Sequence, residues 1–364
     1  MGRSSHFLSG IGGRMIAAGM RGATDGRIGR RAALAGLGAL AACAPRIAPP
    51  GPPDGPPRDA GSALVMADGA RLPLEAWLPA GPPRGAILGL HGFNDYRRAF
   101  ALAAPLCAEA GWAFYAYDQR GFGAAPHPGS WPGHDALAAD ATAAARLIRA
   151  RHPGLTLAML GESMGAAVLL VAAASADPPP ADAYVLSAPA VWGGETMGRF
   201  GRWLLDLAAH TVPALGIVGG SPFIRASDNA AALSAMARDP LVRKSTRVDA
   251  VYGLVALMDA ALAAAARFAA PALILYGARD DLVPERAIAA LAARLPGLAS
   301  GRQRALVYPD GYHLLLRDTI RARVVGDVLA WLADPAAPLS AGSLEAPARL
   351  PPPAASAIGA GTDP

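Results

Sequence analysis

The chain has 364 residues, a length that suits one large α/β domain with an inserted lid. Its formal net charge is +5, but residues 1–42 contain six arginines and one aspartate, so the remainder is electrically balanced. A balanced remainder shows no basic nucleic-acid-binding pattern, and we expect no nucleic acid as a partner.

The N-terminal segment has the pattern of an export signal. Arg30-Arg31 precedes an apolar, alanine-rich run over 32–42, which is shorter than the roughly 20 residues of a membrane span but long enough for a signal-peptide core. Leu40-Ala41-Ala42-Cys43 matches a lipobox, in which the cysteine becomes the lipid-bearing first residue. We therefore expect residues 1–42 to be a lipoprotein signal peptide. An ordinary buried apolar helix is the alternative.

This reading places the mature protein outside the cytoplasm of a bacterium, held to a membrane by lipid on Cys43 and facing the periplasm or the outer surface. The twin arginine suggests Tat export, with Sec export left open, and Met15 or Met20 is an alternative start. Residues 43–60 are rich in proline and predict a linker that packs no core. Residues 336–364 are rich in proline, alanine and glycine and predict a disordered tail.

Between these ends, apolar runs alternate with helical segments, which predicts a mostly parallel central sheet with helices on both faces. Strands are expected at 86–90, 112–117, 155–160, 182–187, 271–276 and 304–308, and helices at 97–110, 135–150, 164–176, 284–295 and 319–332. The helix at 97–110 contains Cys107, which we expect to be a buried thiol. No His/Cys/Asp cluster has metal-ligand spacing and no phosphate-binding glycine loop is present, so no metal or cofactor is expected.

Gly161-Glu162-Ser163-Met164-Gly165 is a G-x-S-x-G motif between a predicted strand and a predicted helix. Such a turn is strained and tightly packed, so it needs small residues beside the serine, and it leaves the hydroxyl near a helix N-terminus. Ser163 is therefore a candidate nucleophile. An ordinary tight turn with an unreactive serine is the alternative.

In this arrangement an acid and a histidine follow the serine in the chain. The strand over 271–276 runs into Asp280-Asp281, and the strand ending at Tyr308 runs into His313. His313 would act as the general base on Ser163, and one of the two aspartates would orient its imidazole. Each of the other histidines lies in the leader, in the cap or before the serine.

Acyl transfer also needs hydrogen-bond donors for the developing oxyanion. The backbone N–H of Met164 is one candidate, and the N–H of Phe93, on the loop after the strand over 86–90, is the other. We interpret His91 as a residue that stabilises this loop and takes no part in catalysis. We interpret Asp118 and Arg120 as a structural ion pair beside the site, with substrate binding as the alternative.

His91-Gly92-Phe93, Asp118-Gln119-Arg120-Gly121, Gly161–Gly165, Gly277-Ala278-Arg279-Asp280 and Tyr312-His313 occur in this order. Together they resemble the monoacylglycerol lipase and lysophospholipase branch of the α/β-hydrolases, also grouped with serine aminopeptidases, over about residues 60–335. The branch's G-x-x-D-x-h-V pattern, with h apolar, selects Asp280 over Asp281. The chain differs from the usual sequence of the branch at two places. Phe93-Asn94-Asp95 replaces smaller residues in the oxyanion loop, and Glu162 stands before the serine where histidine is common.

The resemblance implies an α/β-hydrolase domain over 61–335 with a helical cap at about 190–265. Met197, Phe200, Leu204 and Leu207 recur there at helical spacing beside Trp203, as do Tyr252, Val255 and Met258. We interpret these stripes partly as packing and partly as the inner face of an acyl pocket. A peptidase would more often need a cap carboxylate for an α-amine; Glu195, Asp206, Asp228 and Asp249 are the candidates.

These features predict a serine hydrolase that cleaves carboxylic esters through an acyl-enzyme, with Ser163 as nucleophile, His313 as base, Asp280 as orienting acid, and Phe93 and Met164 as oxyanion donors. The expected substrate is a small-molecule acyl ester such as monoacylglycerol, a lysophospholipid or a similar single-chain ester. An aminopeptidase or thioesterase on the same scaffold is the alternative, followed by a non-catalytic ligand-binding homologue.

Overall fold

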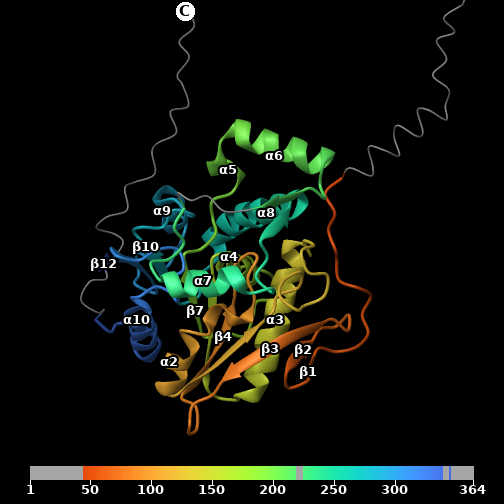
Figure 1. Ribbon diagram of the computed structural model, residues 1–364. Coiled ribbons are helices and arrows are strands. Elements are labelled where there is room, and N and C mark those ends of the chain that lie inside the picture. Colours follow the sequence, from red (N-terminus) through yellow and green to blue (C-terminus); the bar gives the residue numbers. More distant parts are fainter. Residues whose placement is uncertain (1–43, 219–223, 339–343, 346–364) are drawn as a thin grey trace, which may run out of the picture. The chain divides into compact units, whose positions relative to one another are not determined.

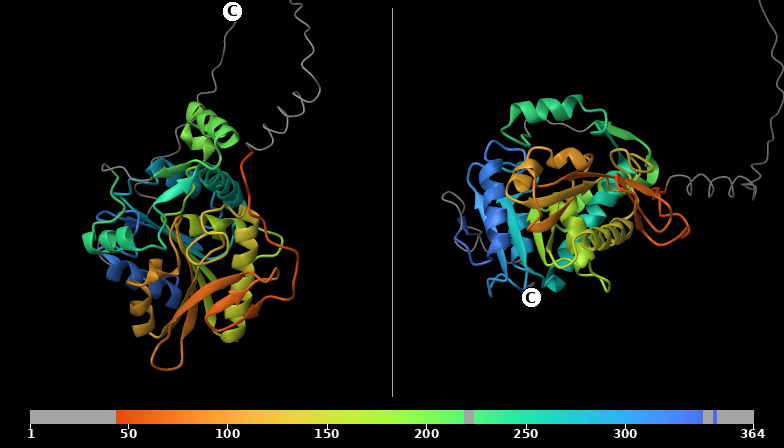
Figure 2. Two further views of the ribbon diagram at one scale, coloured as in Figure 1. Left: turned by 45° about the vertical axis from the view of Figure 1, so that its right-hand side comes forward. Right: turned by 90° about the horizontal axis from the view of Figure 1, so that it is seen from below.

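The computed structural model describes residues 44–218, 224–338 and 344–345. The expected signal peptide, Cys43 and most of the expected tail lie outside the described residues. A central sheet runs through the described domain, and helices lie on both of its sides (Figures 1 and 2).

In the described part of the chain, the sheet has ten strands in the order β1-β2-β3-β5-β4-β6-β7-β10-β11-β12. Their bounds are β1 Arg58–Asp59, β2 Ala63–Val65, β3 Arg71–Trp77, β4 Gly85–Leu90, β5 Trp112–Tyr117, β6 Thr156–Glu162, β7 Ala183–Ser187, β10 Ala272–Gly277, β11 Gln303–Tyr308 and β12 Leu344–Glu345. The six strands from β5 to β11 in this order are parallel, and β1, β2, β3 and β12 are antiparallel to their neighbours. The expected fold class, a mostly parallel sheet, is confirmed.

The parallel strands are buried on both faces, which is why they read as continuous apolar runs. Successive side chains alternate between faces, so Leu88 of β4 joins one core and Ile87 the other. The first core lies under α3 (His134–Arg151), α4 (Met164–Ala173), α8 (Val248–Ala264) and α9 (Glu285–Ala292). The second lies under η1 (Arg97–Phe100), α2 (Ala104–Glu109) and α10 (Arg321–Ala333).

The helix expected over 97–110 is two helices, η1 and α2. Pro105 sits in the first turn of α2, where its missing N–H and fixed φ are tolerated but would interrupt a continuing helix. Cys107 in α2 is buried, as predicted, and burial raises the pKa of its thiol to about 12.

The segment between β7 and β10, which includes the stretch predicted to be a cap and is called the cap below, holds several elements. It contains α5 (Gly194–Met197), α6 (Arg199–Thr211), β8 (Gly216–Val218), α7 (Ala230–Arg238), β9 (Ser245–Arg247) and α8. Of the described helices, the segment Val248–Arg267, which begins with α8, is the one long and apolar enough to cross a membrane. More than half of its apolar window is buried, and α8 packs against α4, as a core helix does.

The two ends of the domain differ from the predictions. β1 to β3 were not expected as strands, and β1 lies inside the segment predicted to be a linker. That segment runs against the domain: Ala48 N–H donates to Trp131 O at 2.8 Å, and Asp59 pairs with Arg151. At the other end, β12 falls in the tail predicted to be disordered and pairs with β11.

Candidate active site

Ser163 lies at the sharp turn between β6 and α4. Its φ of 54° and ψ of −111° are unusual for a residue with a side chain and store strain that the surrounding contacts must hold. Ser163 N–H donates to Ser187 O at 2.9 Å, and Ser163 O accepts from Ala190 N–H at 3.1 Å, so the turn is bonded to the end of β7 and the residues after it. Ser163 is partly exposed, while its neighbours Glu162 and Met164 are buried. Of these three residues, Ser163 is therefore the one that solvent reaches.

The two motif glycines are required by close backbone approach. A Cβ on Gly165 would lie 2.1 Å from the carbonyl oxygen of Leu90, and a Cβ on Gly161 would lie 2.4 Å from the backbone nitrogen of Ala166. Either contact is far shorter than atoms tolerate, so only glycine allows β6 to turn into α4 against the end of β4. The motif thus encodes the turn itself.

His313 and Asp280 are brought together by the loops after β11 and β10. His313 Nδ1 lies 2.8 Å from Asp280 Oδ2, and both side chains are almost fully buried. The other carboxylate oxygen, Oδ1, accepts from Leu282 N–H at 2.8 Å and Val283 N–H at 2.9 Å, which leaves Oδ2 directed at the imidazole.

Of the two adjacent aspartates, Asp280 is the one that contacts the histidine. Asp281 is exposed and accepts from the backbone N–H of Arg225 at 3.1 Å. The two backbone bonds to Asp280 Oδ1 fix its side chain in the turn after β10, whereas Asp281 has no such bonds to its own turn among the contacts described.

The environment of His313 favours its charged form. Burial alone would lower the pKa of the imidazole, but the hydrogen bond that His313 donates to Asp280 and the negative charges of Asp280 and Glu162 outweigh it, so the pKa is raised above its usual value. Arg317 opposes these two carboxylates. A base with a raised pKa accepts a proton readily and holds it as imidazolium while Asp280 neutralises the charge.

The loop after β4 borders the serine. A Cβ on Gly92 would lie 3.5 Å from Ser163 Cβ, so the backbone of Gly92 and Phe93 passes beside the nucleophile. Met164 is the first residue of α4, where a helix leaves its N–H without an intrahelical acceptor. Both expected oxyanion donors thus belong to segments that flank Ser163.

His91 holds this loop, as interpreted from the sequence. Gln119 N–H donates to His91 Nε2 at 3.0 Å, which fixes Nε2 as the acceptor, so Nδ1 carries the hydrogen and donates to Gly92 O at 2.8 Å. The side-chain amide of Gln119 also donates to His91 O at 2.7 Å. Complete burial lowers the pKa of His91, which keeps the ring neutral.

The predicted ion pair between Asp118 and Arg120 is wrong. Asp118 pairs with Arg97 at 2.7 Å, whereas Arg120 bridges Asp68 at 2.6 Å and Asp140 at 3.0 Å. Both residues lie after the end of β5 at Tyr117, where the chain has left the sheet, so the strand rule that puts residues i and i+2 on one face does not apply to them. Arg120 binds the β2–β3 turn to α3, outside the contacts of the serine turn.

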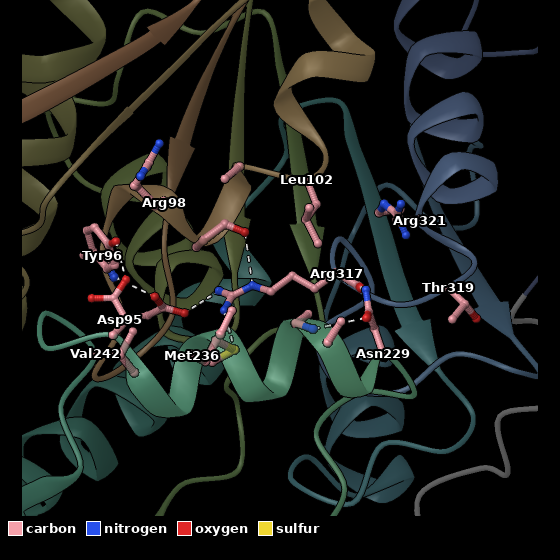
Figure 3. A pocket seen from close by; sticks show the side chains of 16 residues that line it. Asp95, Tyr96, Arg98, Leu102, Asn229, Met236, Val242, Arg317, Thr319 and Arg321 are labelled. Carbon is pink, nitrogen blue, oxygen red and sulfur yellow. Dashed lines mark hydrogen bonds and ion pairs between the residues drawn. The ribbon is translucent and has the colours of Figure 1, made fainter.

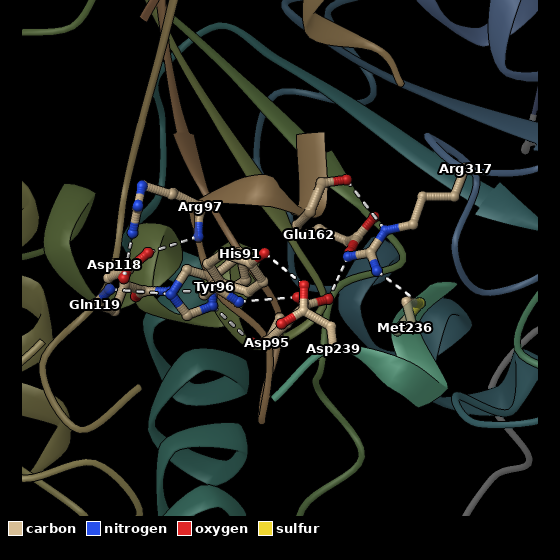
Figure 4. A network of polar contacts seen from close by, with 12 residues as sticks. His91, Asp95, Tyr96, Arg97, Asp118, Gln119, Glu162, Met236, Asp239 and Arg317 are labelled. Carbon is tan, nitrogen blue, oxygen red and sulfur yellow. Dashed lines mark hydrogen bonds and ion pairs between the residues drawn. The ribbon is translucent and has the colours of Figure 1, made fainter. Parts of the chain in front are cut away.

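A buried charge network was not predicted. Arg317, four residues after His313, contacts both Asp95 and Glu162, and all three side chains are nearly inaccessible (Figure 4). Glu162 precedes the serine and Asp95 follows Phe93 by two residues. Each of the three charged residues lies within four positions of a predicted site residue, which the sequence shows. A single sequence does not reveal that these three side chains contact one another.

The apolar residues predicted to form part of an acyl pocket in the cap lie elsewhere. Phe200, Trp203, Leu204 and Leu207 of α6 are exposed by 73, 57, 50 and 44 %. They therefore do not form the enclosed inner face of an acyl pocket in this structure. Tyr252 and Val255 of α8 face α6 across a cavity of about 370 Å³ that Trp203 and Asp206 also line.

The cap carboxylates proposed for an α-amine are engaged elsewhere where their side chains are described. Asp249 is buried and pairs with Arg247, and Asp228 accepts from Thr319 N–H at 2.8 Å. Asp206 lies on exposed α6, 3.5 Å from His210.

Known proteins share this architecture. A family model described as serine aminopeptidase, S33, matches residues 81–320, which is well over half of the chain. A monoacylglycerol lipase of Mycolicibacterium smegmatis is 26 % identical over 271 residues, covering 72 % of this chain and 93 % of the relative. The human monoglyceride lipase is 24 % identical over 266 residues, covering 70 % of this chain and 84 % of the relative.

Among solved structures, a soluble variant of monoglyceride lipase from Saccharomyces cerevisiae, in complex with a substrate analogue, superposes with a TM-score of 0.63 at 19 % identity. The match covers 79 % of this chain and 96 % of the yeast chain, and identity this low establishes the fold. The resemblance read from the ordered motifs is confirmed at the level of family and fold. This chain belongs to the serine aminopeptidase S33 family of α/β-hydrolases.

Proposed function

We propose that the protein hydrolyses carboxylic esters through an acyl-enzyme formed on Ser163. The observation that carries the proposal is the convergence of three segments: a strained serine at a helix N-terminus, the Gly92 backbone against it, and a buried His313–Asp280 pair whose histidine feels the charge of Glu162, the residue before the serine. A strained nucleophile, an oriented base and adjacent backbone donors are the parts that acyl transfer needs.

In the proposed reaction, His313 Nε2 removes the proton of Ser163 as Oγ attacks the ester carbonyl. The N–H groups of Phe93 and Met164 donate to the resulting oxyanion, and Asp280 stabilises the imidazolium. The imidazolium then protonates the leaving alcohol, which departs and leaves the acyl group on Ser163. Water, deprotonated by His313, attacks the acyl-enzyme and releases the carboxylic acid with regeneration of the serine hydroxyl.

For the substrate we propose monoacylglycerol or a similar single-chain ester. Support comes from the two relatives named as monoacylglycerol and monoglyceride lipases. Asp228 and Asp249 already have other partners, and Asp206 lies on exposed α6. These positions give no support to an α-amine site, so we do not favour an aminopeptidase despite the family's description.

The test combines labelling with a substrate series. A fluorophosphonate probe should label the wild-type protein and not Ser163→Ala. Hydrolysis should be strongest for monoacylglycerol and p-nitrophenyl acyl esters compared with lysophosphatidylcholine and aminoacyl-nitroanilides. Faster cleavage of the nitroanilides would favour the aminopeptidase, and no labelling of the wild type would reject a serine hydrolase.

For location we propose an exported lipoprotein anchored through Cys43. The proposal rests on the sequence alone: twin arginines, a short apolar run and the lipobox before Cys43. The acylated protein would act at a membrane surface, where long-chain esters collect.

A further inference from the structure

The three loops that carry the proposed chemistry are joined by one side chain. Arg317 Nε donates to Ala99 O at 3.1 Å in η1, which continues the loop of Phe93. One terminal nitrogen of the same guanidinium donates to Glu162 Oε1 at 3.1 Å and also to Asp95 (Figure 4). We propose that Arg317 is a positioning residue that holds the oxyanion loop, the serine turn and the histidine loop in one fixed arrangement.

The geometry explains why arginine is suited to this place. Its planar fork can donate in several directions at once, whereas a lysine ammonium offers one compact point of charge. Bonds inside the histidine loop couple Arg317 to His313: Arg317 N–H donates to Leu314 O at 2.8 Å, and Asp318 Oδ2 accepts from Tyr312 N–H at 2.7 Å. A displacement of Arg317 would therefore be transmitted to His313.

The charges of the network are not balanced. Two carboxylates face one guanidinium, and Glu162 Oε2 is a buried oxygen with no hydrogen-bond partner among the described residues. Burial raises the pKa of Glu162, and Arg317 opposes that rise. Removing the guanidinium would leave both carboxylates uncompensated beside the serine turn, and such a site rearranges or takes up a proton.

The same charges act on His313. The charged groups that face its imidazole are Asp280 from the loop after β10, Glu162 from β6 and Arg317 from its own loop. Glu162 favours the imidazolium and Arg317 disfavours it. Changes in the Arg317–Glu162 pair should therefore alter the pKa of His313, an effect that a general loss of packing would not produce.

Arg317 is nearly inaccessible in the wild-type protein, but its side chain borders a cavity through which a small ion would reach its place after truncation. It lines a cavity of about 670 Å³ between α7, η1 and the segment that leads into α10, together with Met236, Leu102 and Thr319 (Figure 3). The second terminal nitrogen points toward α7 and meets the Met236 sulfur at 2.8 Å, a weak acceptor. Truncation of Arg317 would enlarge this cavity and leave a guanidinium-shaped vacancy open to it.

The experiment compares Arg317→Ala and Arg317→Lys with Arg120→Ala. Arg120 is the matched control, because it is equally buried and also bridges two carboxylates, but it ties the β2–β3 turn to α3. Melting temperature, kcat and KM for p-nitrophenyl butyrate, and the rate of fluorophosphonate labelling are measured for each. Labelling reports the reactivity of Ser163 independently of substrate preference.

We expect Arg317→Ala to lower kcat and the labelling rate by on the order of 10²-fold with little change in KM, because small misplacements of catalytic groups have effects of that size. Arg317→Lys should recover only part of the loss. Arg120→Ala should lower the melting temperature comparably while its folded fraction keeps nearly full labelling.

Two further readouts keep the inference testable if Arg317→Ala is unstable. Millimolar guanidinium should raise the labelling rate of Arg317→Ala severalfold, while urea, its neutral isostere, should not. In Glu162→Gln, which preserves the side-chain shape, the acid limb of the pH–rate profile should move to lower pH, because the carboxylate that favours the imidazolium is gone.

The inference rests on the proposed function, and the two can fail separately. A wild-type protein that is not labelled rejects the serine hydrolase and this inference with it. A labelled wild type with Arg317→Ala equally reactive rejects the inference alone. The inference is also rejected if Arg317→Ala loses activity only in proportion to its unfolded fraction, which is the result expected for Arg120→Ala. It is likewise rejected if guanidinium and urea have the same effect on Arg317→Ala and Glu162→Gln leaves the acid limb of the pH–rate profile unmoved.

Discussion

At the residue scale, the proposed chemistry depends on single atoms of Asp280. Its Oδ1 is used by two backbone N–H groups and its Oδ2 by His313. Asp280→Asn would place an amide N–H₂ where the imidazole needs an acceptor, and the ring would adopt the wrong tautomer. We expect a loss of about 10⁴-fold in kcat for ester hydrolysis, comparable with Ser163→Ala or His313→Ala, without loss of the folded state.

Asp281→Asn is the control for this substitution. Asp281 is exposed and its described contact is with the Arg225 backbone, so its variant should keep nearly all activity. A damaging Asp281→Asn beside a nearly silent Asp280→Asn would reverse the assignment of the acid.

The pH dependence of turnover follows from His313. The base acts only when neutral, and its pKa is raised in the folded protein. The rate should therefore rise with pH and reach its plateau above the usual pKa of histidine, about 6.5. A profile of kcat/KM for p-nitrophenyl butyrate checks this, and an acid limb well below that range would contradict His313 as the base.

At the scale of elements, Gly165 in the first turn of α4 and Gly326 in α10 have opposite roles. Gly165→Ala would drive a Cβ into the Leu90 carbonyl, so β6 and α4 would separate and activity should fall with stability. Gly326 lies in α10, exposed, and a Cβ there would meet nothing within 4 Å. Gly326→Ala should stabilise the fold by roughly 0.5–1 kcal/mol.

Thermal unfolding of both variants tests this contrast. An increase in melting temperature for Gly326→Ala with unchanged esterase activity, and a decrease for Gly165→Ala, are expected. A stable, active Gly165→Ala would mean that the serine turn tolerates more backbone movement than the packing of Gly165 on Leu90 and His91 allows.

The six parallel strands could be predicted because burial on both faces makes each one a continuous apolar run, as in β4 and β10. The strands β1 to β3 could not, because they are short or half-exposed: β3 contains Pro73 and Glu75 and alternates weakly. The serine turn and His313 could be located from chain order. The Asp95–Glu162–Arg317 network could not, because it joins residues separated by up to 222 positions.

The cap shows a similar limit. The apolar spacing over 197–207 predicted a helix, and α6 forms there, but spacing does not state what an apolar face will contact. Phe200 and Trp203 pack on each other with ring centroids 5.9 Å apart while remaining exposed. Their expected role as an acyl-pocket wall is not supported by this arrangement.

At the scale of the whole molecule, the segment after Cys43 contributes to the domain. The isolated bridge of Ile47 with Trp131 and the pairing of β1 with β2 would be lost in a chain that begins at Ala60. We expect a chain beginning at Ala44 to be soluble and fully active, and one beginning at Ala60 to be active but less stable by about 1 kcal/mol or more. A comparison of their denaturation midpoints tests this prediction. Equal midpoints would mean that residues 44–59 do not stabilise the domain.

The final prediction concerns attachment to the membrane. We expect the mature protein to begin at a lipid-modified Cys43 and to sediment with membranes. A single acyl chain binds membranes weakly and reversibly, at about 0.8 kcal/mol per buried CH₂, whereas the two or three chains of a bacterial lipoprotein hold firmly. The balanced charge of the remaining chain adds no electrostatic attraction to anionic lipid, so the acyl chains would carry the attachment.

Cys43→Ser removes the thiol that would be acylated and should leave either a precursor that is not processed or a released protein. Its catalytic domain should keep the ester-hydrolysing activity of the chain that begins at Ala44, because the described contacts of the site start after residue 60. Fractionation of cells expressing each form, with mass spectrometry of the mature N-terminus, gives the measurement. An unmodified Cys43 inside a longer mature chain, or wild-type and Cys43→Ser proteins found equally in the membrane fraction, would reject the anchor.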